Sequence, residues 1–221
     1  MAMNQQTVVR PAESVLATNK VLRNTYLLLS MTLLFSAAMA FVGMQANVVL
    51  GPLVTLGGYF LLLFLTSRFA NSGLGLVFVF ALTGFLGFTL GPMLNAYLAL
   101  PNGPQLVMTA LGGTGVIFLG LSGYALTTRK DFSFMGGFLI VGILVAFLAG
   151  IGALVFSLPG LSLAVSAMFV LLMSGLILYQ TSEIIHGGET NYILATVTLY
   201  VSLYNLFASL LHLLGAFSGD D

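Results

Sequence analysis

Positive charge occurs in only three short segments of this chain, and long stretches without any charged residue separate them. The lysines and arginines are Arg10, Lys20, Arg23, Arg68, Arg129 and Lys130. No Asp, Glu, Lys or Arg occurs within residues 24–67, 69–128, 132–182 and 190–219. Charged side chains normally supply the water-facing surface of a soluble protein. Most of this surface must therefore face lipid, which indicates a multi-pass membrane protein.

Composition supports the same class and excludes several others. Of 221 residues, 59% are hydrophobic and 5% are charged, against about 25% charged in ordinary globular domains. Cysteine is absent, which excludes disulfides, thiolate metal sites and thiol catalysis. No run of bases indicates a nucleic-acid partner. The first apolar stretch is about 20 residues long, too long for a signal-peptide core, so we expect it to remain as a span.

Breaker residues divide the apolar text into seven stretches, each long enough for a helix of about 20 residues to cross a bilayer. The predicted spans are about 24–44, 49–66, 74–98, 105–126, 134–156, 161–182 and 191–216. The third contains Gly91-Pro92, which leaves open whether that helix is broken there. The sequence therefore predicts an all-α membrane protein built as a seven-transmembrane-helix bundle.

The positions of the bases orient this bundle. With seven spans, the N-terminal segment and the loops at 67–73, 127–133 and 183–190 share one side, and that side carries all six bases. The positive-inside rule places it in the cytoplasm. We therefore expect a cytoplasmic N-terminus and an outside C-terminus. Residues 1–22 are predicted to be a polar, disordered cytoplasmic tail, and residues 23–217 the seven-helix transmembrane domain.

Glycines are dense in the third and fourth spans. Gly87 and Gly91 form a GxxxG pattern, and five glycines occur between residues 112 and 123. Small residues let helix backbones approach closely in lipid. The favoured interpretation is packing within one bundle, and the alternative is a face for a homo-oligomer.

Polar residues at membrane depth concentrate in the last two spans. The candidates for a polar seam or path are Gln180, Tyr200, Ser202 and Asn205. Polar groups in lipid need partners, and clusters of them also mark ion pathways. The sequence leaves both interpretations open, with a structural seam of hydrogen bonds favoured. No nucleophile elbow, phosphate loop or HExxH motif occurs, so we expect no enzyme activity, no catalytic residue and no cofactor.

The loop between these two spans contains two glutamates and a histidine, Glu183, His186 and Glu189. A metal site needs three or four converging ligands, so we expect no metal here. The favoured interpretation is helix punctuation. His186 would lie near a helix C-terminus, Gly187 would supply a left-handed cap, and Thr190 or Asn191 would cap the next helix.

Three segments together resemble the Bax inhibitor family, also called the transmembrane Bax inhibitor motif family, and in particular its bacterial YccA-like subgroup. They are LYQTSEIIHGGETNYILATVTLYVSLYNLFASLLHLLG (178–215), FALTGFLGFTLGPMLNAYL (80–98) and TTRKDFSFMGG (127–137). The resemblance implies seven helices with the C-terminal helix packed centrally. It also implies a place in the bacterial inner membrane and an association with FtsH, the membrane-bound ATP-dependent protease.

Other members of this family are pH-sensitive calcium leak channels with a pair of aspartates in the last two helices. The resemblance matches that pair to Gln180 and Ser202, neither of which ionises, and a basic partner of the pair to Arg68. Two close carboxylates can act as a proton sensor, whereas Gln and Ser cannot. We therefore expect a regulator of membrane proteolysis that binds and restrains FtsH as modulator and slow substrate. The alternative is a calcium or cation leak channel or transporter without the aspartate sensor.

Overall fold

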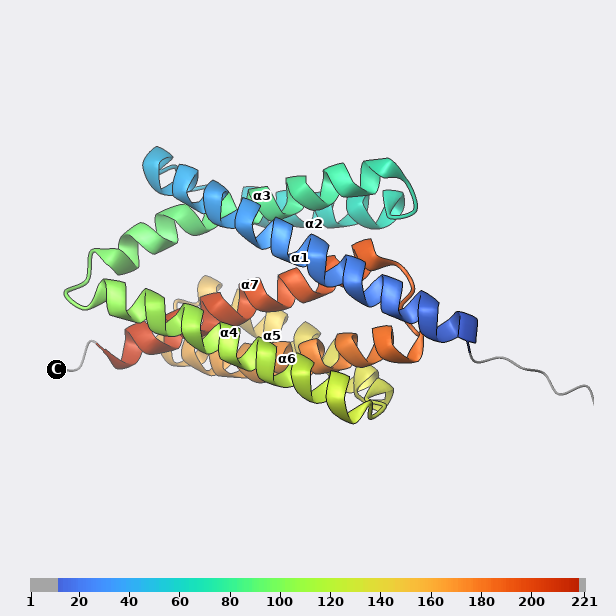
Figure 1. Ribbon diagram of the computed structural model, residues 1–221. Coiled ribbons are helices and arrows are strands. Elements are labelled where there is room, and N and C mark those ends of the chain that lie inside the picture. The colour runs from blue at the N-terminus through green and yellow to red at the C-terminus, as the bar shows by residue number, and fades with distance from the viewer. Residues whose placement is uncertain (1–11, 219–221) are drawn as a thin grey trace, which may run out of the picture.

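A computed structural model describes residues 12–218. Within this part of the chain there are seven α-helices and one short 3-10 helix, and no strand. The elements (Figure 1) are α1 (Ala12–Ala46), α2 (Pro52–Phe69), α3 (Gly73–Leu98), α4 (Gly103–Thr128), η1 (Ser133–Met135), α5 (Gly136–Val155), α6 (Pro159–His186) and α7 (Tyr192–Phe217).

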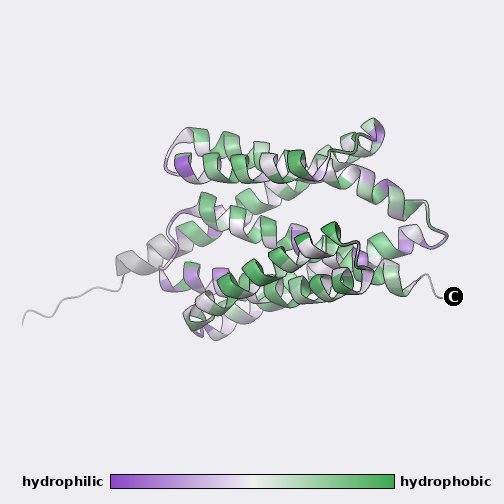
Figure 2. Cartoon of the chain, turned by 180° about the vertical axis from the view of Figure 1, so that it is seen from behind, coloured by the Kyte–Doolittle hydropathy of each residue, from purple (hydrophilic) through white to green (hydrophobic). Residues whose placement is uncertain are grey.

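All seven α-helices are long and apolar enough to cross a membrane, so the predicted number of spans is confirmed. Helices satisfy their own backbone hydrogen bonds, which is why a continuous apolar stretch in lipid becomes a helix. Proline stands in the first turn of three of them, at Pro52, Pro104 and Pro159, where its missing N–H has no helical partner to lose. In Figure 2 hydrophobic residues follow the helices and hydrophilic ones gather toward the ends of the bundle.

One boundary differs from the sequence-based expectation, and one open question is answered. Helix α1 begins at Ala12, well before the predicted start of the first span near residue 24. Residues 12–22 of the predicted tail are therefore helical, while residues 1–11 lie outside the described part. Helix α3 runs unbroken through Pro92. This proline cannot donate to the carbonyl of Phe88, and Gly43 of α1 faces that freed oxygen instead.

The helices form two groups, α1–α3 and α4–α7, which lie one above the other in Figure 1. Helix α7 contacts α6 and α4 in its own group and α1 and α3 in the other group. It is the most buried of the seven: 61% of an 18-residue apolar stretch within it is buried, against 6% for α2. Large apolar side chains such as Leu53 are exposed on the outer helices, as expected where lipid is the solvent.

The closest helix approach joins α1 and α3 through the predicted GxxxG residues. A Cβ atom added to Gly91 would lie 2.2 Å from the carbonyl carbon of Gly43, and one added to Gly87 would lie 2.3 Å from the carbonyl oxygen of Ser36. These two glycines therefore allow close packing of helices within one bundle, in agreement with the favoured interpretation. By contrast, a Cβ added to Gly112, Gly115, Gly120 or Gly123 of α4 would meet nothing within 4 Å.

Candidate functional site

Tyr200 is the centre of a polar seam that joins the two groups of helices. Its side chain, on α7, is only 2% exposed. The hydroxyl donates to the backbone oxygen of Thr83 on α3 at 3.1 Å and shares a 2.6 Å hydrogen bond with the hydroxyl of Ser36 on α1. One phenol therefore links three helices at membrane depth, where water cannot satisfy it.

Tyr204 lies one turn further along α7 and faces the same way. Its hydroxyl is 3.2 Å from the hydroxyl of Thr89 on α3, and Thr89 in turn donates to the backbone oxygen of Leu86 at 2.8 Å. The rings of Tyr200 and Tyr204 are 6.5 Å apart. The two tyrosines are four residues apart, so both project from one face of α7.

The other predicted seam residues do not join this network. Ser202 donates to the backbone oxygen of Thr198 at 2.7 Å, and Asn205 donates to that of Val201 at 2.9 Å. Both are bonds to the preceding turn of the same helix, a common solution for short polar side chains in helices. The four candidates therefore do not form one continuous hydrogen-bonded chain.

Gln180 of α6 is buried, and its amide nitrogen has no hydrogen-bond partner among the described residues. No hydrogen bond joins it to Ser202 in the described part of the chain. The next residue, Thr181, is placed near two hydroxyls from other helices, at 3.4 Å from that of Tyr26 and 3.5 Å from that of Ser122. Polar contacts of α6 therefore reach α1 and α4.

Sequence reasoning missed the partners that other helices contribute to this seam: Ser36, Thr83, Thr89 and Ser122. Each is an isolated hydroxyl residue in an apolar stretch, and most serines and threonines in such stretches bond only to their own helix. The available signal was that each of these residues lies inside a predicted span, where a polar group needs a hydrogen-bond partner. Nothing in the sequence indicates which of them meets a tyrosine.

At the end of the bundle that carries the bases, the C-terminal end of α6 holds the α4–α5 loop. Ser182 accepts a 3.0 Å hydrogen bond from the backbone N–H of Phe132 and donates to the backbone oxygen of Lys130 at 3.3 Å. His186 places its Nε2 atom 3.1 Å from the backbone oxygen of Arg129. Gly187 follows with φ 78°, the left-handed conformation that ends α6.

The α6–α7 loop, which follows directly, holds the α2–α3 loop through Asn191. Its side-chain oxygen accepts from the backbone N–H groups of Ile193 and Leu194, which makes Asn191 the N-cap of α7. Thr190 does not take that place, because α7 begins at Tyr192 and the cap must directly precede it. The side-chain nitrogen of Asn191 donates to the backbone oxygen of Ala70 at 3.1 Å.

The ionisable groups at this end are placed for water or headgroups. Arg68 is exposed, and its guanidinium lies 6.0 Å from the centre of the Phe69 ring. No hydrogen bond links it to Gln180 or Ser202 within residues 12–218. The backbone N–H of Ser133 donates to the Asp131 carboxylate at 2.8 Å and holds its pKa below the usual value. Residues 12–218 contain no cluster of three His, Asp or Glu that could hold a metal ion.

Seven apolar spans and a seam of neutral hydroxyls define a multi-pass helical membrane protein. Comparison with known sequences specifies which one. The sequence matches the family described as "Inhibitor of apoptosis-promoting Bax1" over residues 18–219, so the chain belongs to the Bax inhibitor family.

Relatives in three bacteria support this assignment and the location. The chain is 54% identical, over 94% of both chains, to a protein of Escherichia coli named "Modulator of FtsH protease YccA". The same identity and coverage relate it to a protein of another Escherichia coli strain named "Inner membrane protein YccA". A Vibrio cholerae relative named "Uncharacterized membrane protein" is 46% identical over 95% of both chains. The chain is thus a multi-pass inner-membrane protein of the YccA-like subgroup.

Proposed function

We propose that this chain binds and restrains the ATP-dependent membrane protease FtsH, as a modulator that is itself degraded slowly. One observation carries the proposal: 54% identity over 94% of both chains to the Escherichia coli protein whose name is modulator of FtsH protease. The role is non-enzymatic, because the polar seam consists of hydroxyl and amide groups that are neutral at physiological pH.

The proposed orientation puts the N-terminus in the cytoplasm and the C-terminus outside. The α4–α5 loop, which carries Arg129 and Lys130, is held by Ser182 and His186 of α6. The α2–α3 loop, which follows Arg68 at the end of α2, is held by Asn191. Bases at this end and none at the other follow the positive-inside rule. A cytoplasmic protease would then meet the tail of residues 1–22 before it meets any span.

Resistance to extraction is the proposed means of restraint. Helix α7 contacts α1, α3, α4 and α6, and 61% of an 18-residue apolar stretch within it is buried, which supports a central place for this helix. Helices α1 and α3 meet at backbone contact distance around Gly91. A protease that pulls on the tail must separate α1 from α3 and from α7, so each attempt occupies it for a long time.

The test removes only residues before the first helix. Deleting residues 2–11 leaves α1 intact from Ala12. Binding through the membrane helices should therefore persist, while the segment that the protease grips is lost. In cells producing this variant, an unassembled membrane subunit that FtsH degrades should live longer, and the variant should itself be long-lived and co-purify with FtsH. A variant with residues 2–11 replaced by Gly and Ser should restore turnover, because it restores the length of the tail.

An unchanged lifetime of the client subunit, together with no co-purification of FtsH, would contradict the proposal. If the deleted variant were degraded as fast as the full chain, the tail would not be the handle. Cells with catalytically inactive FtsH are the control for both lifetime measurements. In them the full-length protein should accumulate and should not change the rate at which the membrane subunit is lost.

A cation leak is the second candidate, and the observation that favours it is the buried amide nitrogen of Gln180, which has no hydrogen-bond partner within residues 12–218. The hydroxyl of Ser202 and the amide of Asn205 are already engaged with their own helix, which argues against a continuous path. If the protein is a protease modulator and not a leak, liposomes that contain the purified protein should show no more calcium flux than empty liposomes. Substituting Gln180→Asp and Ser202→Asp together should create pH-dependent flux if these positions line a path.

A further inference from the structure

A lateral groove of about 400 Å³ opens between α1 and α4, with α3 and α7 as its floor. We call it the α1–α4 groove. Its size lies within the roughly 300–1,000 Å³ of ligand pockets. Among the side chains and backbone that line it are Ala37, Phe41, Leu94, Leu111, Gly115 and Phe207.

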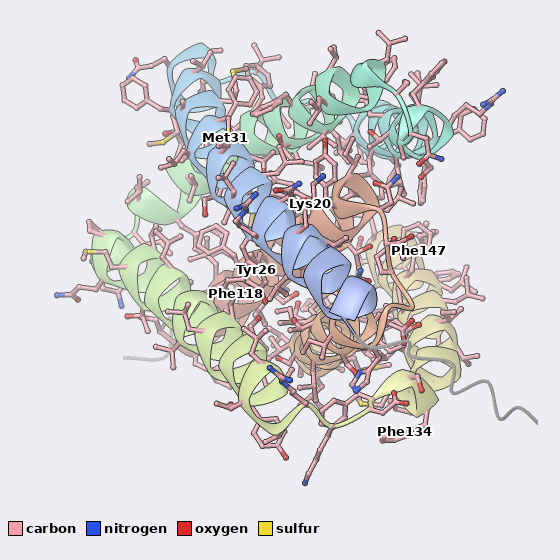
Figure 3. The ribbon with its side chains drawn as sticks, turned by 45° about the vertical axis from the view of Figure 1, so that its right-hand side comes forward. Lys20, Tyr26, Met31, Phe118, Phe134 and Phe147 are labelled. Atoms are coloured by element: carbon pink, nitrogen blue, oxygen red, sulfur yellow. The ribbon has the colours of Figure 1, made fainter. Side chains whose placement is uncertain are left out.

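The groove lies at membrane depth and is closed at one end. It occupies residues 33–44 of α1 and 107–118 of α4, in the half of the bundle away from the loops that carry the bases. At its inner end Phe118 of α4 meets Tyr26 of α1, with ring centres 5.9 Å apart, and the two are labelled next to each other between α1 and α4 in Figure 3. Exposed rim residues such as Phe41, 60% exposed, leave the side open to lipid.

The few polar groups in the lining already have partners. The hydroxyls of Ser36 and Tyr200 bond to each other, and that of Tyr204 bonds to Thr89. Thr114 donates to the backbone oxygen of Ala110 at 2.7 Å. An apolar occupant therefore leaves no polar group unpaired, whereas water finds almost no partner here.

Volume decides what that occupant is. A helix about 10 Å wide with a 5.4 Å pitch fills roughly 400 Å³ with each turn, so the groove holds only about one turn of a partner's or second copy's helix. A hydrocarbon chain is far thinner and follows the length of the groove. Left empty, the cleft would deprive its lining of dispersion contacts.

We propose that the α1–α4 groove is a binding site for one acyl chain of a membrane phospholipid. The acyl chain lies between the α1–α3 group and the α4–α7 group and completes their packing over Tyr200. No base occurs in residues 24–67 or 69–128, so nothing at this end attracts an anionic headgroup and the acyl chain carries the recognition. This site is independent of the proposed protease role.

The test compares two glycines of α4 that differ only in facing the groove. Both Gly115 and Gly120 leave a new Cβ in open space, but only Gly115 lines the groove. Purified wild-type chain and the G115L and G120L variants are stripped with detergent, exposed to palmitoyl-oleoyl phosphatidylethanolamine, and weighed by native mass spectrometry. Wild type and G120L should retain one phospholipid. G115L should retain at least roughly tenfold less phospholipid, because the leucine side chain occupies the path of the acyl chain.

Equal retention by G115L and G120L, or none by wild type, would overturn the proposal. A dimer mass that G115L abolishes would also overturn it, because the occupant would then be a second copy. Ala37→Leu, on the opposite wall, serves as a second blocking variant if G115L elutes as an aggregate. It should show the same loss of lipid.

Discussion

Replacing Gly91 of α3 with alanine should destabilise the bundle, whereas the same change at Gly120 of α4 should stabilise it. At Gly91 the added Cβ would lie 2.2 Å from the carbonyl carbon of Gly43 and 2.3 Å from the backbone nitrogen of Met44. Carbon atoms in good contact are about 3.5–4.0 Å apart, so α1 and α3 must separate by roughly 1.5 Å. Backbone atoms in two helices cannot move aside as a side chain could.

Overpacking of this kind costs about 1–3 kcal/mol and sometimes more, and we expect Gly91→Ala at the upper end of that range. At Gly120 nothing lies within 4 Å of the new Cβ, so only the helix propensity of alanine counts. That propensity contributes about 0.5–1 kcal/mol in favour of the helix. The two variants should therefore differ by about 3–4 kcal/mol in the free energy of unfolding.

Unfolding by SDS in mixed micelles, followed by far-ultraviolet circular dichroism, measures this difference directly. Equal free energies of unfolding for the two variants would refute the reasoning, because they would mean that α1 and α3 do not meet at Gly91. The same pair also probes the proposed restraint of the protease. Gly91→Ala should be extracted and degraded faster than wild type, and Gly120→Ala should not.

Two further changes test the seam and the loop. Tyr200→Phe leaves Ser36 without its 2.6 Å partner, and should cost about 1–3 kcal/mol in the free energy of unfolding measured by the same titration; an unchanged midpoint would place the Tyr200 hydroxyl elsewhere. The pKa of Asp131 is lower in the folded protein than the ordinary aspartate value of about 3.9. Its carboxylate therefore stabilises the α4–α5 loop at pH values above about 3.9, and this stability is lost as the pH falls through the folded pKa. The protection of the Ser133 amide from hydrogen exchange, taken relative to an unstructured peptide at the same pH, should then fall at low pH, and Asp131→Asn should abolish that fall.

Much of the fold was predictable because lipid imposes a simple rule on sequence. Any apolar stretch of about 20 residues becomes a helix, so six predicted spans agree with the observed helices within a few residues at most boundaries. The first helix starts earlier, because a helix can extend into water beyond its apolar part. Helix α3 runs through Pro92, and Gly43 of α1 lies against the Phe88 carbonyl to which this proline cannot donate.

The site was less predictable. Tyr200, Ser202, Gln180 and Asn205 looked alike as polar residues in apolar helices. Tyr200 reaches other helices because its hydroxyl stands far from its own backbone, while the short side chains of Ser202 and Asn205 return to the preceding turn. Residue type thus explains the outcome, although it did not identify Ser36 as the partner, 164 residues away in the chain.

The sequence by itself determined the membrane class, the number of helices and the family, because hydropathy, charge placement and local motifs are properties of neighbouring residues. Only the tertiary structure decided which glycines are filled by a neighbouring backbone and which stay open. It also decided which hydroxyls join helices and where a lateral groove remains between α1 and α4. The physical reason is that these features depend on distances between residues far apart in the chain, and two identical glycines differ only in what the fold places against them.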